Sequence, residues 1–271
     1  MTRRDPPAGR DSFLLTRAKR DHLRLLAEYF CLRTNDLAAL RAKAGTGESA
    51  RRSARRSLLL LHRQGWAARR PFLDLENAAG GFTYVYGLSE KGVRHARAEG
   101  HACGATKPFG EHSARTLDHE LAISGFHIAL ARFATASGLE LYWLQKDLKR
   151  TVHPDAVFAL TDPSAPEERN TRYWFLEVER AKAGNYRDGE PQIARKLRAY
   201  ARYRGTRACE KDWGDFREFS VAVVLPTDAR RRHLLAAMGS DLPPATFVLT
   251  TEAACRDGSD MALFAVAERD P

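Results

Sequence analysis

Residues 173–180 read YWFLEVER, and this segment constrains the fold more than any other part of the 271-residue chain. Its aromatic and large apolar residues are typical of a strand that is buried. Glu177 and Glu179 interrupt the run two positions apart, so a strand directs both carboxylates to the same face. The segment therefore predicts a buried strand of an α/β domain that carries two acidic side chains.

These carboxylates need a compensating charge, because burying an unpaired charge costs several kcal/mol. Asp155, which follows Pro154 at the start of another expected strand, adds a third acidic group. A hard, oxygen-liganded ion such as Mg²⁺ is the simplest partner for one aspartate and two glutamates. The alternative is a set of salt bridges to Arg180, Lys182 or Arg195.

The elements expected around this strand alternate between helices and strands. Residues 117–136 carry a broad apolar face at helical spacing. The segments that follow are expected as strands 139–144, 156–160 and 173–179, helix 191–203, strand 219–225, helix 228–238, and strands 246–250 and 261–266. This order predicts a layered α/β domain over residues 117–271.

The N-terminal third has a different pattern. We expect helices at 16–29, from Thr34, from Glu48 to Gly65 and from Glu90, and strands at 67–73 and 82–88. Thr34 and Ser89 are natural N-caps, and glycines separate the strands. Three helices, a hairpin and a further helix are the order of a winged helix-turn-helix, which we place at residues 16–100.

Charge is concentrated in the same third. Residues 1–100 hold 20 Lys and Arg against 10 Asp and Glu, so the net charge of +10 belongs to this part. Basicity confined to one domain is the footprint of a module that neutralises phosphates. The candidate DNA-binding residues are Arg51, Arg52, Arg55, Arg56, Arg69 and Arg70. The first four repeat in pairs along the third helix, where such proteins read the major groove, although a solvated helix face is the alternative.

The remaining segments carry fewer signals. Residues 1–15 are expected to be a disordered basic tail. Residues 101–116, which contain Gly104, Pro108 and Gly110 and show little periodicity, are expected to be a linker. No apolar run is long enough for a membrane span or a signal peptide, which favours a cytoplasmic protein. The cysteines are scattered without a CxxC pair, which favours reduced thiols over disulfides or zinc.

The order of these features resembles a known family. Pro154-Asp155, then Glu177-Val178-Glu179 on the following strand, after a helix bearing Glu120, is similar to the PD-(D/E)XK restriction-endonuclease-like superfamily. With the expected winged helix, the YVYGLSEKG segment, the LDHELA helix start and FLEVER followed by RKLRAY, the chain resembles the replication-relaxation family over most of residues 16–205. That family is implicated in plasmid replication and DNA relaxation. It is similar to the mobilisation-protein C relaxases, which couple a helix-turn-helix to this nuclease-like fold.

The resemblance implies a restriction-endonuclease-like domain with a central mixed sheet and one or two Mg²⁺ or Mn²⁺ ions. Asp155 and Glu177 would bind the metal, with Glu120 or Glu179 as a further ligand. Glu179 stands where many relatives have a lysine that orients water and stabilises developing negative charge, which glutamate cannot do. Lys196 on the following helix, or Lys182, could supply that charge.

Histidines and tyrosines leave further chemistry open. His119 precedes Glu120 and His153 precedes Pro154, so each could be a ligand, a general base or a phosphate contact, or simply structural. Many relaxases of other families attack DNA with a tyrosine, for which the chain offers Tyr186, Tyr200 and Tyr203. Core packing is favoured for Tyr200, because it shares an apolar helix face with Ile193 and Leu197.

The leading hypothesis is a plasmid replication-relaxation or mobilisation protein. It would bind double-stranded DNA, expected at a plasmid origin, through the winged helix and nick it at a metal-dependent carboxylate site. The alternative is a non-catalytic DNA-binding replication or transcription regulator whose nuclease-like domain serves protein contacts. A homodimer fits either hypothesis, since winged-helix modules often act as dimers.

Overall fold

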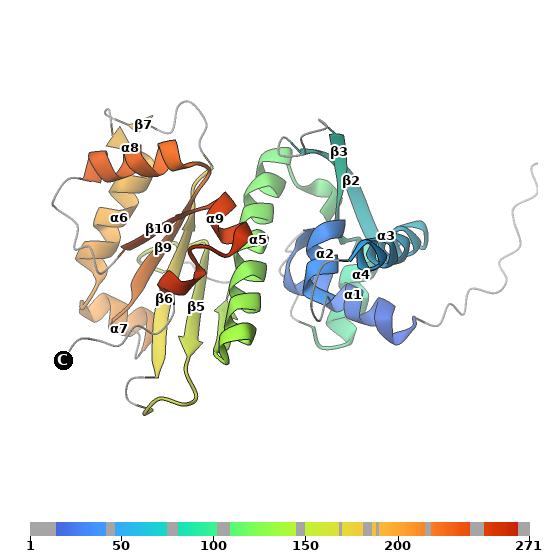
Figure 1. The fold of residues 1–271 in the computed structure, drawn as a ribbon, viewed down its shortest axis with the longest axis horizontal. Helices are drawn as coiled ribbons and strands as arrows, with labels where there is room; N and C mark the ends of the chain where they lie inside the picture. Colours follow the sequence, from blue (N-terminus) through green and yellow to red (C-terminus); the bar gives the residue numbers. More distant parts are fainter. Residues whose placement is uncertain are drawn as a thin grey trace, which may run out of the picture. The chain divides into compact units, whose positions relative to one another are not determined.

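The computed structural model describes residues 15–41, 47–74, 81–101, 109–144, 150–167, 170–180, 186–187, 190–214, 218–238 and 247–264. The chain divides into two compact units, Met1–Ala38 with Thr46–Gly110, and Ala39–Gly45 with Glu111–Pro271. The fold is mixed α/β, as the sequence predicts, and includes a five-stranded mixed sheet (Figure 1). Apart from Leu15, the expected basic tail lies outside the described residues.

The first unit contains helices and a small antiparallel sheet. Its elements are α1 (Arg17–Glu28), β1 (Cys31–Arg33), α2 (Thr34–Arg41), α3 (Glu48–Arg63), β2 (Ala67–Asp74), β3 (Gly81–Leu88), α4 (Glu90–Ala98) and the 3₁₀ turn η1 (Phe109–Glu111). The sheet order is β1-β3-β2. Strand β1 was not expected, because three residues are too few to show a period. The other elements, η1 aside, follow the expected order.

Two contacts hold the hairpin against the helices of this unit. The Ser89 hydroxyl accepts the Gly92 N–H, the N-cap expected from the sequence, and lies 2.5 Å from the Gly65 carbonyl oxygen. Phe109 is buried beneath Gly87, and its ring lies edge-on to Phe30 at 6.4 Å. Burial of such a ring stabilises by about 1.5–3 kcal/mol.

The prediction of a linker at residues 101–116 is therefore partly wrong. Phe109 belongs to the core of the first unit, and the Ser113 side chain accepts the Thr116 N–H, so that the next helix begins at Ala114 and not at Leu117. Residues 102–108 of that segment lie outside the described residues. A single buried aromatic residue and a local cap leave no periodic signal in a Gly- and Pro-containing stretch.

The second unit is layered. Its elements are α5 (Ala114–Ser137), β4 (Glu140–Leu144), β5 (Ala156–Thr161), β6 (Thr171–Val178), β7 (Tyr186–Arg187), β8 (Glu190–Pro191), α6 (Gln192–Tyr203), α7 (Arg207–Trp213), β9 (Ser220–Leu225), α8 (Asp228–Met238), β10 (Phe247–Thr251), α9 (Glu252–Asp257) and the 3₁₀ turn η3 (Met261–Phe264). The large sheet has the order β10-β9-β6-β5-β4. Strands β10, β9 and β6 are parallel, whereas β6, β5 and β4 are antiparallel.

Strand β6 is at the centre of this sheet, with a helical layer on each face (Figure 1). Trp174 and Leu176 pack with α5, α9 and η3, whereas Phe175 packs with α6, α7 and α8. Alternation along the strand places Glu177 on the same face as Phe175. The YWFLEVER segment is thus apolar because both of its faces are covered.

The C-terminal part of the unit differs from the expectation. A strand was expected at 261–266, and this prediction is wrong for residues 261–264, which form η3. Met261 and Phe264 are both buried and Leu263 is half exposed, which is the three-residue spacing of a 3₁₀ turn. Helices α7 and α9 were not expected. Each is short and starts at a threonine, Thr206 or Thr251, whose side chain accepts a backbone N–H of the first turn.

Two helical glycines should respond oppositely to alanine. A Cβ at Gly92 would collide with the Trp66 carbonyl oxygen, whereas a Cβ at Gly125 on α5 would meet open space. We expect Gly92→Ala to lower the free energy of unfolding by about 1–3 kcal/mol and Gly125→Ala to raise it by about 1 kcal/mol. Urea denaturation followed by circular dichroism measures both. Equal changes of the same sign would contradict the packing described around Ser89.

Candidate active site

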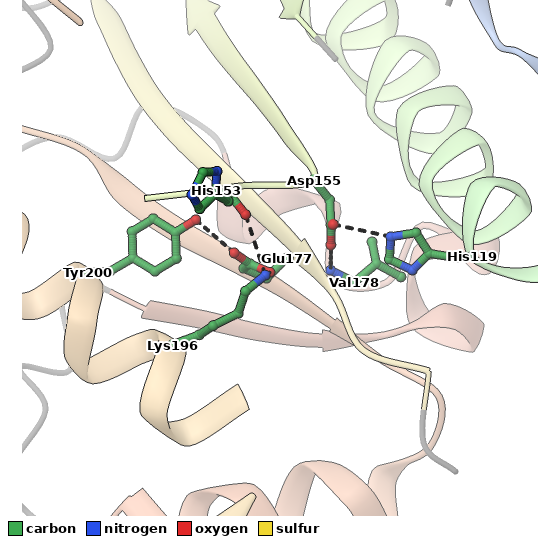
Figure 2. A network of polar contacts seen from close by, with 7 residues as sticks. All are labelled: His119, His153, Asp155, Glu177, Val178, Lys196 and Tyr200. Atoms are coloured by element: carbon green, nitrogen blue, oxygen red, sulfur yellow. Dashed lines mark hydrogen bonds and ion pairs between the residues drawn. The ribbon is translucent and has the colours of Figure 1, made fainter. Parts of the chain in front are cut away.

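Asp155 lies at the start of β5, and its carboxylate is fixed from two directions (Figure 2). The Val178 N–H donates to one oxygen at 2.7 Å, and the His119 ring Nε2 lies 3.1 Å from the other. His119 comes from α5, so this carboxylate joins the end of β6 to the helix on one face of the sheet.

Glu177 lies beside it, with its side chain turned toward α6. The residue is 1% exposed, and the Tyr200 hydroxyl donates to its Oε1 at 2.7 Å. The Lys196 ammonium donates to Oε2 at 2.5 Å and also to the His153 carbonyl oxygen at 3.4 Å. Lys196 and Tyr200 are four residues apart, which places both on one face of α6. Lys196 was expected, as one of two candidates, to supply the positive charge that the strand lacks at Glu179. The structure places its ammonium against the Glu177 carboxylate.

The protonation of Glu177 is strongly perturbed. Burial and the negative charge of Asp155 raise its pKa to about 7, and the opposing effects of Lys196 and Tyr200 do not cancel them. Near neutral pH this carboxyl group thus still takes up protons, whereas an ordinary glutamate is ionised. The repulsion between the two carboxylates is the property that a bound cation would relieve.

The pKa of His119 is also raised. Burial alone would lower it, but the hydrogen bond to Asp155 and the charges of Asp155 and Glu120 outweigh burial. Glu120 is half-buried next to His119 on α5 and acts on it through its charge. The imidazole is therefore held in place and carries its proton to a higher pH than an ordinary histidine.

Of the three tyrosines considered as nucleophiles, Tyr200 and Tyr203 have described side chains, and both act as hydrogen-bond donors. Burial and the nearby Glu177 raise the pKa of Tyr200, and burial together with Asp212 raises that of Tyr203. Tyr203 donates to Asp212 at 2.7 Å. Tyr200 is in the core, as expected, but its hydroxyl contact was missed, although its spacing from Lys196 could have revealed it. The Tyr186 side chain lies outside the described residues.

Glu179 has a partner that the sequence did not indicate. Arg230 of α8 binds both of its carboxylate oxygens, with Nε at 3.0 Å from Oε2. The Arg230 side chain is only 12% exposed, so this ion pair is largely shielded from solvent. Arg180, offered as a salt-bridge partner for the glutamates, instead binds Asp118 and Glu252. Lys182 lies outside the described residues, and Arg195 is exposed.

These contacts narrow the expected metal site. Within the described ranges, no three His, Cys, Asp or Glu side chains are grouped as a ready-made metal site. Mg²⁺ often uses only one or two protein carboxylates and takes its remaining ligands from water and phosphate. Asp155, which is partly buried, and Glu177, which is buried, repel each other and fit that mode. Glu179 is instead bound to Arg230.

Residues 23–218 match the replication-relaxation family. The chain belongs to the replication-relaxation family. The comparisons with curated proteins and with solved structures gave no match. Membership indicates a role in plasmid replication or relaxation, and with it an interaction with DNA. No helix among the described residues is long and apolar enough to cross a bilayer.

The candidate DNA-binding arginines of this replication-relaxation protein divide into two groups by their exposure. Those of α3 are exposed, whereas Ala54, Leu58 and Leu61 of the same helix are buried. The exposed group is Arg51, Arg52, Arg55 and Arg56. Arg69 and Arg70 on β2 are half-buried, and the Arg69 guanidinium lies over the Tyr84 ring at 4.5 Å.

The raised pKa of Glu177 makes stability depend on pH. From an ordinary value of 4.5, the unfolded chain releases this proton first as pH rises, while the folded chain retains it until about pH 7. We expect the wild type to lose on the order of 3 kcal/mol relative to Glu177→Gln between about pH 4 and pH 8, with no further loss above.

Chemical denaturation at several pH values measures this difference. Glu140→Gln, an exposed position on β4, is the matched control and should follow the wild type. Parallel stability curves for the wild type and Glu177→Gln would contradict the burial of a perturbed carboxyl group.

Proposed function

We propose that this protein binds double-stranded plasmid DNA, expected at an origin, and nicks one strand. The site that nicks the strand is formed by Asp155 and Glu177. The observation that carries the proposal is the contact between the Lys196 ammonium and Glu177. It brings to the paired carboxylates a lysine that the strand itself does not provide, because Glu179 stands where many relatives have lysine. The family indicates DNA as the partner, and the paired carboxylates favour phosphodiester chemistry.

Asp155 and Glu177 are the residues that would hold Mg²⁺ or Mn²⁺. Such an ion, when bound, lowers the pKa of a water molecule and neutralises charge on a phosphate. The carboxylates of the chain set its position, since Asp155 is fixed by the Val178 N–H and Glu177 by Tyr200.

The remaining groups have defined tasks. A water molecule releases a proton to solvent, its oxygen forms the new bond to phosphorus, the bond from phosphorus to the leaving sugar oxygen breaks, and that oxygen takes a proton. Lys196 stabilises negative charge on the phosphate, since its side chain is 39% exposed and can reach a bound strand. His119, with its raised pKa, is the group that can donate the proton. Water is favoured over Tyr200 as nucleophile because Tyr200 is buried and holds its proton.

The first unit supplies the DNA-binding part of the proposal. Its order of helices followed by the β2–β3 hairpin is that of a winged helix-turn-helix, in which α3 takes the recognition position. The buried face of α3 leaves its four arginines in solvent, where phosphates or base edges can be bound.

Nicking of supercoiled plasmid carrying the cognate origin tests the site. With Mg²⁺ or Mn²⁺, we expect Asp155→Asn and Glu177→Gln to reduce the rate at least about 100-fold, and Lys196→Ala to reduce it by a similar factor. EDTA should abolish nicking. Arg195→Ala, an exposed neighbour of Lys196 on α6, is the matched control and should nick normally. A wild type that binds DNA without nicking it would favour the non-catalytic regulator instead.

Salt dependence tests the α3 surface. Each phosphate contact contributes about 0.9 to the slope of log affinity against log salt concentration. We expect Arg51→Ala/Arg55→Ala to reduce the slope for duplex DNA by about 2 and to weaken binding.

Fluorescence anisotropy over a salt series gives the slopes. Arg94→Ala on α4, exposed and paired with Glu90, should keep the slope of the wild type. Equal slopes for the α3 variant and the wild type would remove α3 from the DNA interface.

A further inference from the structure

The β2–β3 hairpin, here called the wing (67–74 and 81–88), exposes two aromatic rings side by side. Phe82 is 73% exposed and Tyr84 is 42% exposed. They are two residues apart on β3 and therefore share a face. Tyr86, the next residue on that face, is only 2% exposed, so the ribbon leaves the core of its unit between Tyr86 and Tyr84.

A positive charge lies on the same face. Arg69 pairs in register with Tyr86, and Pro71 pairs with Tyr84. The Arg69 guanidinium covers the Tyr84 ring at 4.5 Å, and Pro71 is exposed. The face thus combines two exposed rings, a proline and an arginine on a two-stranded ribbon.

This combination fits an unpaired nucleotide better than a duplex. Exposed aromatic rings stack on the faces of bases, and a neighbouring arginine can bind the phosphate that links them. In duplex DNA those base faces are already stacked on one another, so only an opened strand offers them. The basic surplus of residues 1–100 supplies the matching charge.

We propose that the Phe82–Tyr84 face of the wing binds unpaired bases of single-stranded DNA, with Arg69 at the backbone phosphate. This inference rests on the proposed function for DNA as the partner, but it does not require the carboxylate site to be active. Its consequence is that the protein binds opened as well as paired DNA, the duplex through α3 and the opened strand through the wing.

Binding in EDTA, where metal-dependent cleavage is absent, tests the inference. The full-length protein is titrated into a single-stranded oligothymidine with a central 2-aminopurine, and separately into a labelled duplex. We expect Phe82→Ala and Tyr84→Ala each to weaken single-strand binding about 5- to 100-fold. Duplex affinity should change less than about threefold, because α3 is untouched.

Two further variants provide controls. Tyr84→Phe keeps the ring and should bind single strands as the wild type does. Tyr142→Ala removes a tyrosine that is 55% exposed on β4, away from the wing in sequence, and should have no effect.

Several outcomes would overturn the inference. These are wild-type affinity for single strands in both alanine variants, equal losses for single-stranded and duplex DNA, or conversion of a wild-type dimer to monomers by the alanine variants. The last would make the face a contact between copies of the chain. A wild type that binds single strands through these rings but nicks nothing would sink only the nuclease proposal.

Discussion

The burial of Glu177 next to Asp155 is the interaction on which the second unit depends. Two acidic groups at the end of the central strand cannot be left without compensation, because desolvation and mutual repulsion both disfavour their charged forms. Lys196 and Tyr200 approach Glu177 from one helical layer, and His119 approaches Asp155 from the other. The same contacts that make these charges tolerable also assemble a lysine and a histidine around two carboxylates.

The residues after Glu177 extend this arrangement. Glu179 is bound by Arg230 of α8, and Arg180 is bound by Asp118 of α5 and Glu252 of α9. Ion pairs therefore connect the residues after β6 to both helical layers. Each of the two charges, that of Glu179 and that of Arg180, has a partner of opposite sign. Breaking one partner of such a pair is costly, so these residues are expected to keep the candidate site in place.

The sequence predicted what depends on local periodicity and capping, and it missed what depends on distant partners. The order of helices and strands in residues 16–100, the Ser89 cap and the apolar strand at 173–178 follow from local spacing and residue type. Lys196 was a candidate for the missing positive charge because it lies on the helix that follows the strand. Arg230 is 51 residues from Glu179, and nothing local to either residue indicates that they pair. Short elements such as β1 and η3 lack enough residues to show a period, which is why one was missed and the other was expected as a strand.

Manganese binding tests directly whether Asp155 and Glu177 form a metal site. Electron paramagnetic resonance of Mn²⁺ titrated with the protein counts bound ions without requiring DNA or cleavage. The wild type should bind Mn²⁺, and Asp155→Asn or Glu177→Gln should abolish this binding. Glu179→Gln should retain it, because Glu179 is held by Arg230. Loss of binding in Glu179→Gln alone, or a wild type that binds no Mn²⁺, would contradict this prediction.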